Sequence, residues 1–263
     1  MDSHCRSDSS AIAGAWSFVC DDEKIEVYEY SGFVIKIYDI EDHPNMMRQM
    51  SCDDDVALSY HDCLLRNSDV KLLNGPYWLN DAVIGFYFEY LEKSIETECQ
   101  YQIKFASPEL TQLLKMLESN DYPAILNSTI TNETDFIFFP LNNCDKVDDV
   151  GGSHWSLLIY SRAEKSCFHF DSFHGSNDTQ AKIFAGKIMQ YLLDMKSTNY
   201  KEISCPQQNN SYDCGIFVLC YAKIVLQHLK SHSKVEGCDL REVKSMANTK
   251  RSELLEIIKK LNK

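Results

Sequence analysis

The longest apolar run of the chain, Gly215–Leu226, places the strongest limit on the fold, because a run of this length must be removed from water. Lys223 interrupts it, and it falls short of the roughly 18–20 apolar residues that a membrane span requires. The run therefore predicts an apolar helix from about Cys214 to His228 in a soluble protein without a membrane partner. A chain of 263 residues can bury roughly 70–75% of the surface that it exposes when unfolded, so one compact domain needs no disulfide or metal support.

The charge of the chain is strongly acidic and unevenly distributed. The 26 Lys and Arg residues against 39 Asp and Glu give a net charge of −13, which argues against a nucleic-acid partner and favours a partner with a basic face. Residues 1–54 hold 4 basic and 12 acidic side chains and so carry −8, which leaves −5 for residues 55–263. We assign residues 1–54 to an acidic N-terminal extension and residues 55–263 to the main domain.

The extension contains two β-prone runs, Lys24–Tyr30 and Phe33–Ile40, joined by Ser31-Gly32, which predict a hairpin. A lone hairpin is marginally stable in water, so it either docks on the main domain or stays mobile. Alternatively, translation begins at Met47 or Met50 and the extension is dispensable.

The cysteines indicate a reducing compartment. There are 11, an odd number, and no two have the Cys-x-x-Cys spacing of zinc sites. The apolar run Ala11–Cys20 is not a convincing secretory signal, because the segment before it holds Asp2, Asp8 and a single basic residue, Arg6. We therefore expect mostly free, buried thiols, no metal, no cofactor, and a location in the cytoplasm, the nucleus or both.

Helix and strand signals strengthen from Asp55 onward. Asn80-Asp81 and Ser107-Pro108 are typical helix starts, and apolar residues at helical spacing follow both. Later helices are predicted around Ala181–Leu192 and Leu254–Leu261. Strands are predicted at Phe136–Leu141, Trp155–Tyr160, Ser166–Asp171 and near Tyr200–Ser204, the second and third forming an antiparallel hairpin. Helices around a central, mostly antiparallel sheet make an α+β fold.

Reactive side chains stand at the boundaries of these elements. His154 precedes one strand of the hairpin and Asp171 ends the other, so both lie at the same end of the sheet, where the carboxylate can orient the imidazole. Cys214 stands where a polar loop meets the apolar helix, and the helix start lowers a thiol pKa. A thiolate with a base and an orienting group is what acyl transfer requires. Gln208, six residues earlier, is placed to form an oxyanion hole with the Cys214 backbone N–H.

Each of these residues also has a plainer interpretation. Taken singly, Cys214 is typical of a buried small hydrophobe and Asp171 of a residue that ends a strand in a turn. His169 and His174 compete with His154 for the role of base. The joint occurrence favours a cysteine hydrolase, and the chain order His, Asp, Cys excludes papain itself, in which Cys comes first.

The set His154-Trp155, Asp171, Gln208 and Tyr212-Asp213-Cys214-Gly215 resembles the Ulp/sentrin-specific family of cysteine proteases, which cut after the Gly-Gly tail of ubiquitin-like modifiers. The resemblance implies the papain-like fold of the Ulp type. It also implies Cys214 as nucleophile, His154 as general base and acid, Asp171 as orienter and Gln208 as oxyanion donor.

Within that family the chain is most similar to the deneddylase branch, which acts on the modifier Nedd-eight, also called Rub. Leu58-Ser59-Tyr60, Leu64-Leu65-Arg66, Ser68-Asp69-Val70 and Trp78-Leu79-Asn80-Asp81 carry this likeness, together with Gly151-Gly152. It runs from about Asp55 to the C-terminus and says nothing of residues 1–54. It implies processing of the modifier precursor, its removal from target lysines, cullin-type targets and a monomeric enzyme.

The resemblance also assigns residues to the modifier. Trp78 and Trp155 match two tryptophans that flatten the modifier's tail, and a tunnel walled by indoles admits glycine and excludes residues with a Cβ. The alternative for either is a core aromatic. Asp81 and the acidic loop Asn142–Val150, with Asp145, Asp148 and Asp149, are expected to contact the basic surface of the modifier and close over its tail, unless the loop is only a solvated surface loop.

Two rival functions remain open. The catalytic motifs are shared across the family, so the modifier could be SUMO, because one or two tail residues decide between similar modifiers. In a different class, the domain could bind a modifier without catalysis, but the presence of all four catalytic-type residues speaks against this.

Overall fold

The computed structural model describes residues 54–262 apart from 96–99, 127–129, 132, 146–151 and 196–198, together with the backbone of three strands nearer the N-terminus. The chain divides into two compact units, residues 1–53 and 54–263.

The first unit contains an antiparallel sheet in the order β1 (Ala15–Cys20), β2 (Glu23–Tyr30) and β3 (Phe33–Tyr38). The predicted hairpin is confirmed as β2 paired with β3. β1 adds a strand that the sequence pattern did not predict. The alternatives given for residues 1–54, which are docking on the main domain, mobility or dispensability, stay predictions.

The second unit is built on a five-stranded sheet in the order β10-β9-β8-β7-β6. Its strands are β6 (Ile103–Phe105), β7 (Phe136–Asn142), β8 (Trp155–Ser161), β9 (Ser166–Phe170) and β10 (Tyr200–Glu202). The three central strands pair antiparallel as predicted, but both edge strands pair in parallel, so the sheet is mixed. Long helical connections join β6 to β7 and β9 to β10, and they let the second strand of each pair run in the same direction as the first.

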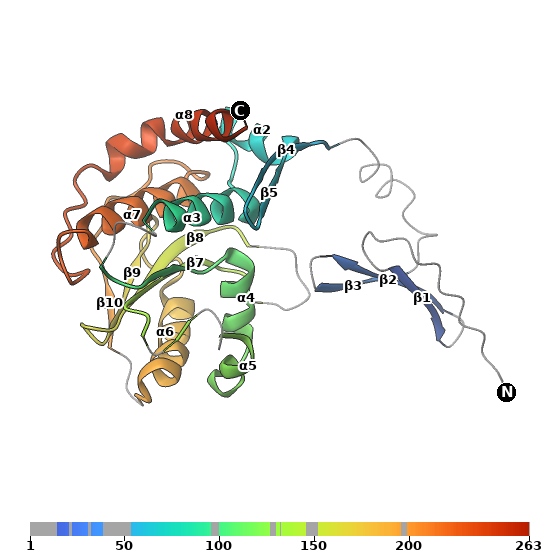
Figure 1. The fold of residues 1–263 in the computed structure, drawn as a ribbon, viewed down its shortest axis with the longest axis horizontal. Coiled ribbons are helices and arrows are strands. Elements are labelled where there is room, and N and C mark those ends of the chain that lie inside the picture. Colours follow the sequence, from blue (N-terminus) through green and yellow to red (C-terminus); the bar gives the residue numbers. More distant parts are fainter. Residues whose placement is uncertain are drawn as a thin grey trace. The chain divides into compact units, whose positions relative to one another are not determined.

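Helices cover both faces of this sheet, which explains why its strands are apolar almost throughout (Figure 1). Phe136 and Phe138 of β7 point to the face covered by α3 (Asp81–Ile95) and α7 (Cys214–Leu229), outside which lies α8 (Val243–Leu261). The alternate residues of β7 point to the other face, covered by α4 (Pro108–Met116), α5 (Tyr122–Leu126) and α6 (Asp178–Leu193).

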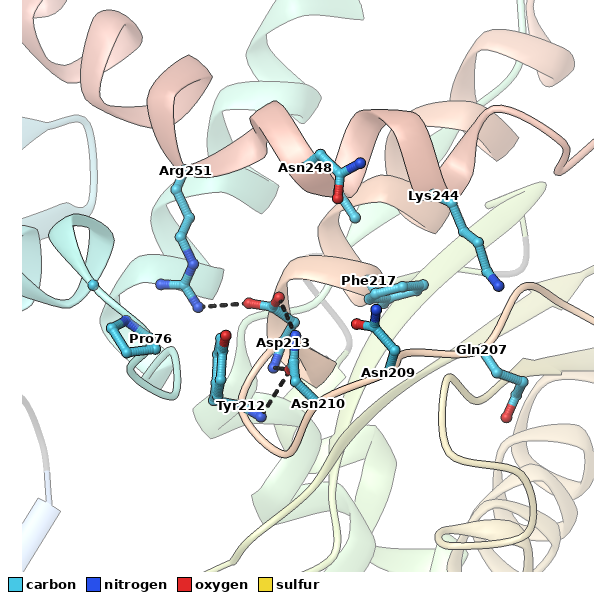
Figure 2. Close-up of a pocket in the computed structure, with 12 residues that line it drawn as sticks. Pro76, Gln207, Asn209, Asn210, Tyr212, Asp213, Phe217, Lys244, Asn248 and Arg251 are labelled. Atoms are coloured by element: carbon cyan, nitrogen blue, oxygen red, sulfur yellow. Dashed lines mark hydrogen bonds and ion pairs between the residues drawn. The ribbon is translucent and has the colours of Figure 1, made fainter.

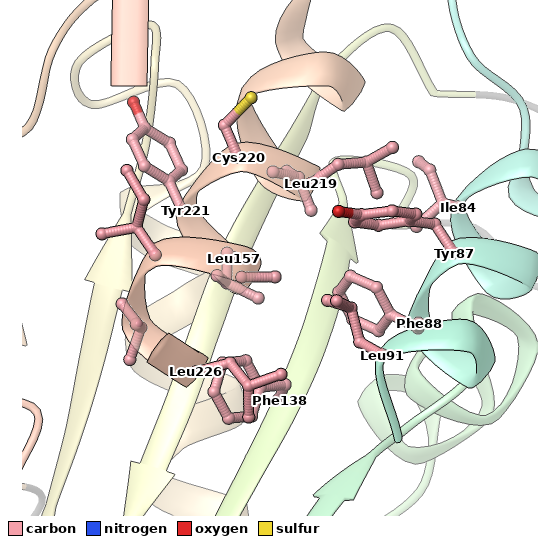
Figure 3. Packing of buried hydrophobic residues seen from close by; sticks show 14 of the residues in the cluster. Ile84, Tyr87, Phe88, Leu91, Phe138, Leu157, Leu219, Cys220, Tyr221 and Leu226 are labelled. Carbon is pink, nitrogen blue, oxygen red and sulfur yellow. The ribbon is translucent and has the colours of Figure 1, made fainter. Parts of the chain in front are cut away.

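The apolar run that limits the fold is α7, which lies between the sheet and α8 and buries nearly its whole length. Its Leu219 and Leu226 pack against α3 and against Phe138 of the sheet (Figure 3). Its single charge, Lys223, donates to Glu253 of α8 at 2.8 Å and so avoids an unpaired charge in the core. No described helix is both long and apolar enough to cross a membrane.

The predicted helix starts are present as well. The Asn80 side chain accepts a hydrogen bond from the Val83 N–H at 3.2 Å, and Ser107 Oγ accepts one from the Leu110 N–H at 3.1 Å. We did not predict one more hairpin, whose turn at His61-Asp62 lacks a Gly or Pro signal, or several short helical segments. They are β4 (Val56–Tyr60), β5 (Cys63–Arg66), α2 (Asn67–Lys71), η1 (Leu72–Asn74) and η2 (Ser119–Asp121). All seven described cysteines are free, and three of them, among them Cys214, are buried.

Candidate active site

His154 and Asp171 meet at one end of the sheet, as the hairpin predicts. His154 immediately precedes β8, and Asp171 immediately follows β9, whose Phe170 pairs with Leu157. The His154 Nε2 and Asp171 Oδ1 atoms lie 2.6 Å apart, and both residues are buried.

The Asp171 carboxylate is held in its ionised form. Burial opposes ionisation, but the hydrogen bond from His154 and those from the backbone N–H groups of Phe173 (2.9 Å) and Asn177 (3.1 Å) outweigh it and hold the Asp171 pKa below its usual range. A fixed anion at this position orients the imidazole and stabilises its protonated form.

Cys214 is the first residue of α7 and is only 1% exposed. The His154 imidazole hydrogen-bonds to Asp171 and lies close enough to Cys214 for the thiol to shift its pKa. Burial would lower the pKa of this histidine, but the hydrogen bond to Asp171, the interaction with Cys214 and the negative charge of the Asp171 carboxylate raise it to about 9. Because Asp171 occupies Nε2, Nδ1 is the atom left for the sulfur. The residues predicted as nucleophile, base and orienter are therefore brought together.

The two competing histidines lie elsewhere. His169 is on the opposite face of the sheet, where Nε2 pairs with Ser156 Oγ (2.9 Å) and Nδ1 with the Tyr200 hydroxyl (2.8 Å), and burial lowers its pKa to about 4. His174 is exposed and pairs with Glu202 at 3.1 Å. His154 is the one of the three that faces both Asp171 and Cys214.

Gln208, in the loop before Cys214, is fixed by three hydrogen bonds, two to Ser172 and one to Asn210. Its backbone N–H donates to Ser172 O (3.0 Å), its Oε1 accepts from the Ser172 hydroxyl (2.6 Å), and its Nε2 donates to Asn210 O (2.6 Å). One of the two Nε2 hydrogens remains available to a ligand. The role of Gln208 as oxyanion donor stays a prediction that this placement allows.

Trp78 is held against the same loop, because its indole N–H donates to Ser211 O at 2.6 Å. It is 48% exposed, so it is not a core aromatic. Trp155 is half-buried, packs on the core and donates to Leu79 O at 3.1 Å. Asp81 is exposed at the start of α3. Asp148 and Asp149 lie outside the described residues, as does most of the acidic loop.

Sequence reasoning missed the residues that clamp the two ends of that loop. Asn143 Oδ1 accepts from the backbone N–H groups of Ser153 (2.7 Å) and His154 (3.1 Å), which fixes the entry to the catalytic histidine. Gly152 has φ +127°, and a Cβ there would lie 1.7 Å from Asn142 Oδ1. The Gly151-Gly152 pair is the sequence signal that could have indicated this close approach.

A cavity of about 560 Å³ lies behind the catalytic loop (Figure 2). Its walls come from Gly75-Pro76, from loop residues between Gln207 and Asp213, from Phe217 and from α8. Neither Cys214 nor His154 lines it.

One described cluster has side chains of the kind that bind metals: ligand atoms of His169, Asp178 and Glu202 lie within 4.8 Å of one another. Each already has a partner, since Tyr200 OH bridges His169 and Asp178, and Glu202 pairs with His174. The cluster lies away from Cys214, on the face of the sheet that carries His169.

Comparisons with known proteins find similar proteins over most of the chain. Residues 77–261 fit the model of the Ulp1 protease family, C-terminal catalytic domain. The chain is 40% identical to sentrin-specific protease 8 of Rattus norvegicus over 177 residues, which cover 67% of this chain and 82% of that protein. It is 32% identical to NEDD8-specific protease 1 of Arabidopsis thaliana over 218 residues, 80% of this chain and 95% of the relative.

Among solved structures, the fold is similar to the C-terminal Ulp1 protease domain crystallised with Smt3, the yeast orthologue of SUMO. The TM-score is 0.61 at 19% identity, and the match covers 85% of this chain and 96% of that one.

Proposed function

The chain belongs to the Ulp1 protease family, and from that premise we propose that it is a cysteine protease that cleaves after the C-terminal Gly-Gly of NEDD8. The reaction matures the NEDD8 precursor and removes NEDD8 from the lysines of its conjugates. The observation that carries the chemistry is the 2.6 Å contact between His154 and Asp171 beside a cysteine at a helix start. The modifier is assigned from relatives that are named NEDD8-specific proteases.

The geometry supports a two-step acyl transfer. An imidazolium beside the sulfur favours the thiolate, which attacks the carbonyl carbon of the terminal glycine. The backbone N–H of Cys214 and the free Nε2 hydrogen of Gln208 stabilise the oxyanion. His154 gives its proton to the leaving amine, and the thioester forms. His154 then takes a proton from water, which attacks the thioester and releases the modifier with a free carboxylate.

Selection of the tail rests on the tryptophans. Trp78 is anchored over the loop that leads to Cys214, and Trp155 directly follows the catalytic histidine. Flat indole faces on either side of the tail leave room for glycine alone. Asp81, Asp148 and Asp149 complete the proposal as acidic contacts to the basic surface of the modifier.

Three further elements belong to the proposal: cullin-type conjugates as targets, a monomeric enzyme, and a location in the cytoplasm, the nucleus or both. The family resemblance supports the first two, and the free cysteines of the described residues support the location.

The test is a comparison of C-terminally extended NEDD8, SUMO and ubiquitin, together with NEDD8 linked to a lysine side chain, as substrates of the wild type and Cys214→Ala. We expect both NEDD8 substrates to be cleaved, with kcat/KM for SUMO and ubiquitin lower on the order of 100-fold or more. The Cys214→Ala variant should bind NEDD8 without turnover.

If the wild type prefers SUMO, the assignment of NEDD8 as the modifier is wrong and the chain is a SUMO protease. A wild type that binds NEDD8 without cleaving any substrate would favour a modifier-binding domain. Alkylation of the thiol should abolish activity, and a chelator should leave it unchanged.

A further inference from the structure

Arg251 of the C-terminal helix α8 connects three segments that lie far apart in the sequence. Its Nη1 donates to Leu72 O at 2.7 Å, and its Nη2 donates to Tyr77 O at 2.7 Å and to Asp213 Oδ1 at 2.8 Å. Its guanidinium also lies 5.9 Å from the centre of the Tyr212 ring. Figure 2 shows the ion pair with Asp213 at the edge of the cavity.

Two of these contacts are one residue away from the proposed site. Tyr77 precedes Trp78, and Asp213 precedes Cys214 at the N-cap position of α7. The indole of Trp78 in turn donates to Ser211 O, two residues before Asp213. The contacts therefore form a closed ring that runs from Arg251 through the Trp78 segment and the catalytic loop and back to Arg251.

The network continues from Asp213 to the proposed oxyanion donor. The second carboxylate oxygen of Asp213 accepts from Asn210 Nδ2 at 2.8 Å. Asn210 Oδ1 accepts from the backbone N–H groups of Tyr212 (3.1 Å) and Asp213 (2.9 Å), and its carbonyl accepts from Gln208 Nε2. A displacement of Asp213 is thus transmitted to the Gln208 amide through Asn210.

Packing alone does not fix the loop on this side. The cavity of about 560 Å³ lies between α8 and loop residues Asn209, Asn210, Tyr212 and Asp213. Among the described residues, the Arg251–Asp213 contact is the one hydrogen bond or ion pair that joins this loop to α8. Since a cavity removes van der Waals support from its walls, a polar link has to hold the loop in place.

We propose that Arg251 is a positioning residue that holds the Trp78 wall of the tail-binding tunnel and the Gln208–Cys214 loop in the geometry needed to cleave the modifier. The inference rests on the proposed protease function. Arginine is required, because its planar fork donates in two directions, to Leu72 on one side and to Tyr77 and Asp213 on the other. Lysine carries the charge without the fork.

The test compares Arg251→Met and Arg251→Lys with Arg241→Ala, a matched control in which an exposed arginine paired with Asp239 is removed. Two rates are measured on each folded protein: kcat/KM for the extended modifier that the wild type prefers, and the rate at which iodoacetamide alkylates Cys214. Alkylation needs the thiolate but neither the tunnel nor the oxyanion hole, so it separates positioning of the loop from loss of the catalytic pair.

We expect Arg251→Met and Arg251→Lys to lower kcat/KM at least about tenfold while alkylation stays within about twofold, and Arg241→Ala to match the wild type in both. Adding Asp213→Asn to Arg251→Met should cost little more than the worse single change, because both break the same link.

Cleavage within twofold of the wild type by Arg251→Lys or Arg251→Met would overturn the proposal, as would equal losses in cleavage and alkylation, which indicate a general structural role. If Arg251→Met does not fold, Arg251→Lys, which keeps the positive charge, carries the test. The Arg251 test compares variant with wild type on whichever modifier the wild type prefers, so it does not depend on which modifier that is. The choice of the wild type among modifiers tests the proposed function separately.

Discussion

Replacing Asp171 by asparagine removes the anion next to His154 while it keeps the shape of the side chain and an acceptor for the imidazole. Asparagine serves as the orienting residue in papain-like proteases, so orientation should survive in part. The loss should instead come from the charge, because the pKa of His154 falls once the carboxylate is absent.

The size of the effect follows from the His154 pKa. Its rise from 6.5 to about 9 corresponds to roughly 3 kcal/mol in favour of the imidazolium. If the whole rise were lost, the imidazolium fraction at pH 8 would fall from about nine-tenths to about 3%, a loss of about 30-fold. At pH 6 the same change costs less than about 1.5-fold. Burial, which lowers the His154 pKa, and Cys214, which raises it, both remain in the variant and act in opposite directions, so about 30-fold is the expected order of magnitude.

The assay is kcat/KM for the extended modifier between pH 5.5 and 10. Activity of the wild type should fall as the pH rises through about 9, where the imidazolium is lost, and the upper limb of Asp171→Asn should move toward 6.5. Asp239→Asn, which alters an exposed carboxylate paired with Arg241, should leave the profile unchanged. A loss of equal size at pH 6 and pH 8 would refute the electrostatic argument. Asp171 would then act only by orienting the imidazole.

Three further predictions follow from the site. Trp78→Ala should lower kcat/KM for the modifier at least about tenfold, but it should lower the free energy of unfolding by less than about 1 kcal/mol, since the indole is half exposed. Kinetics and urea unfolding of the same protein measure the two effects. A large loss of stability with little loss of cleavage would mean that the indole has only a structural role. Gln208→Ala should reduce kcat on the order of 100-fold with little change in KM, as expected for an oxyanion donor, and a rise in KM alone would contradict that role. Burial lowers the pKa of His169 to about 4, from 6.5 in the unfolded chain, so the folded protein binds fewer protons than the unfolded one between these pH values. The free energy of unfolding should therefore rise with pH between about 4 and 6.5, by up to roughly 3 kcal/mol. Urea unfolding of His169→Gln should show no such rise, and an unchanged rise would mean that another group causes it.

The candidate catalytic residues were predictable because each stands at an element boundary that local patterns reveal. The hairpin between β8 and β9 places His154 beside Asp171 by register alone, and the polar loop before an apolar run locates Cys214 at a helix start. The layers were predictable for the same reason, since strands that are apolar throughout must be covered on both faces.

The residues that support the site were not predictable from these patterns. Arg251 reaches Asp213 across 38 positions of sequence, and Asn143 clamps His154 through backbone groups that no periodicity marks. The parallel pairing of β6 and β10 also depends on how helical connections return to the sheet, and three-residue edge strands carry too few side chains to indicate a direction.

The exposed position of Trp78 is another long-range result. A tryptophan followed by Leu79 and a helix start is compatible with the core or with the surface. What decides between them is the hydrogen bond from the indole N–H to Ser211 O, 133 residues away.

The central claim is that Cys214 attacks the C-terminal glycine of NEDD8, and covalent capture tests it most directly. The purified protein is mixed with NEDD8, SUMO and ubiquitin probes that carry a C-terminal electrophile, with Cys214→Ala as control, and the attachment site is mapped by peptide mass spectrometry. The account predicts labelling by the NEDD8 probe alone, at Cys214, and none in the variant. Labelling by the SUMO probe instead, or attachment to Cys205, which also contacts Asp171, would contradict it.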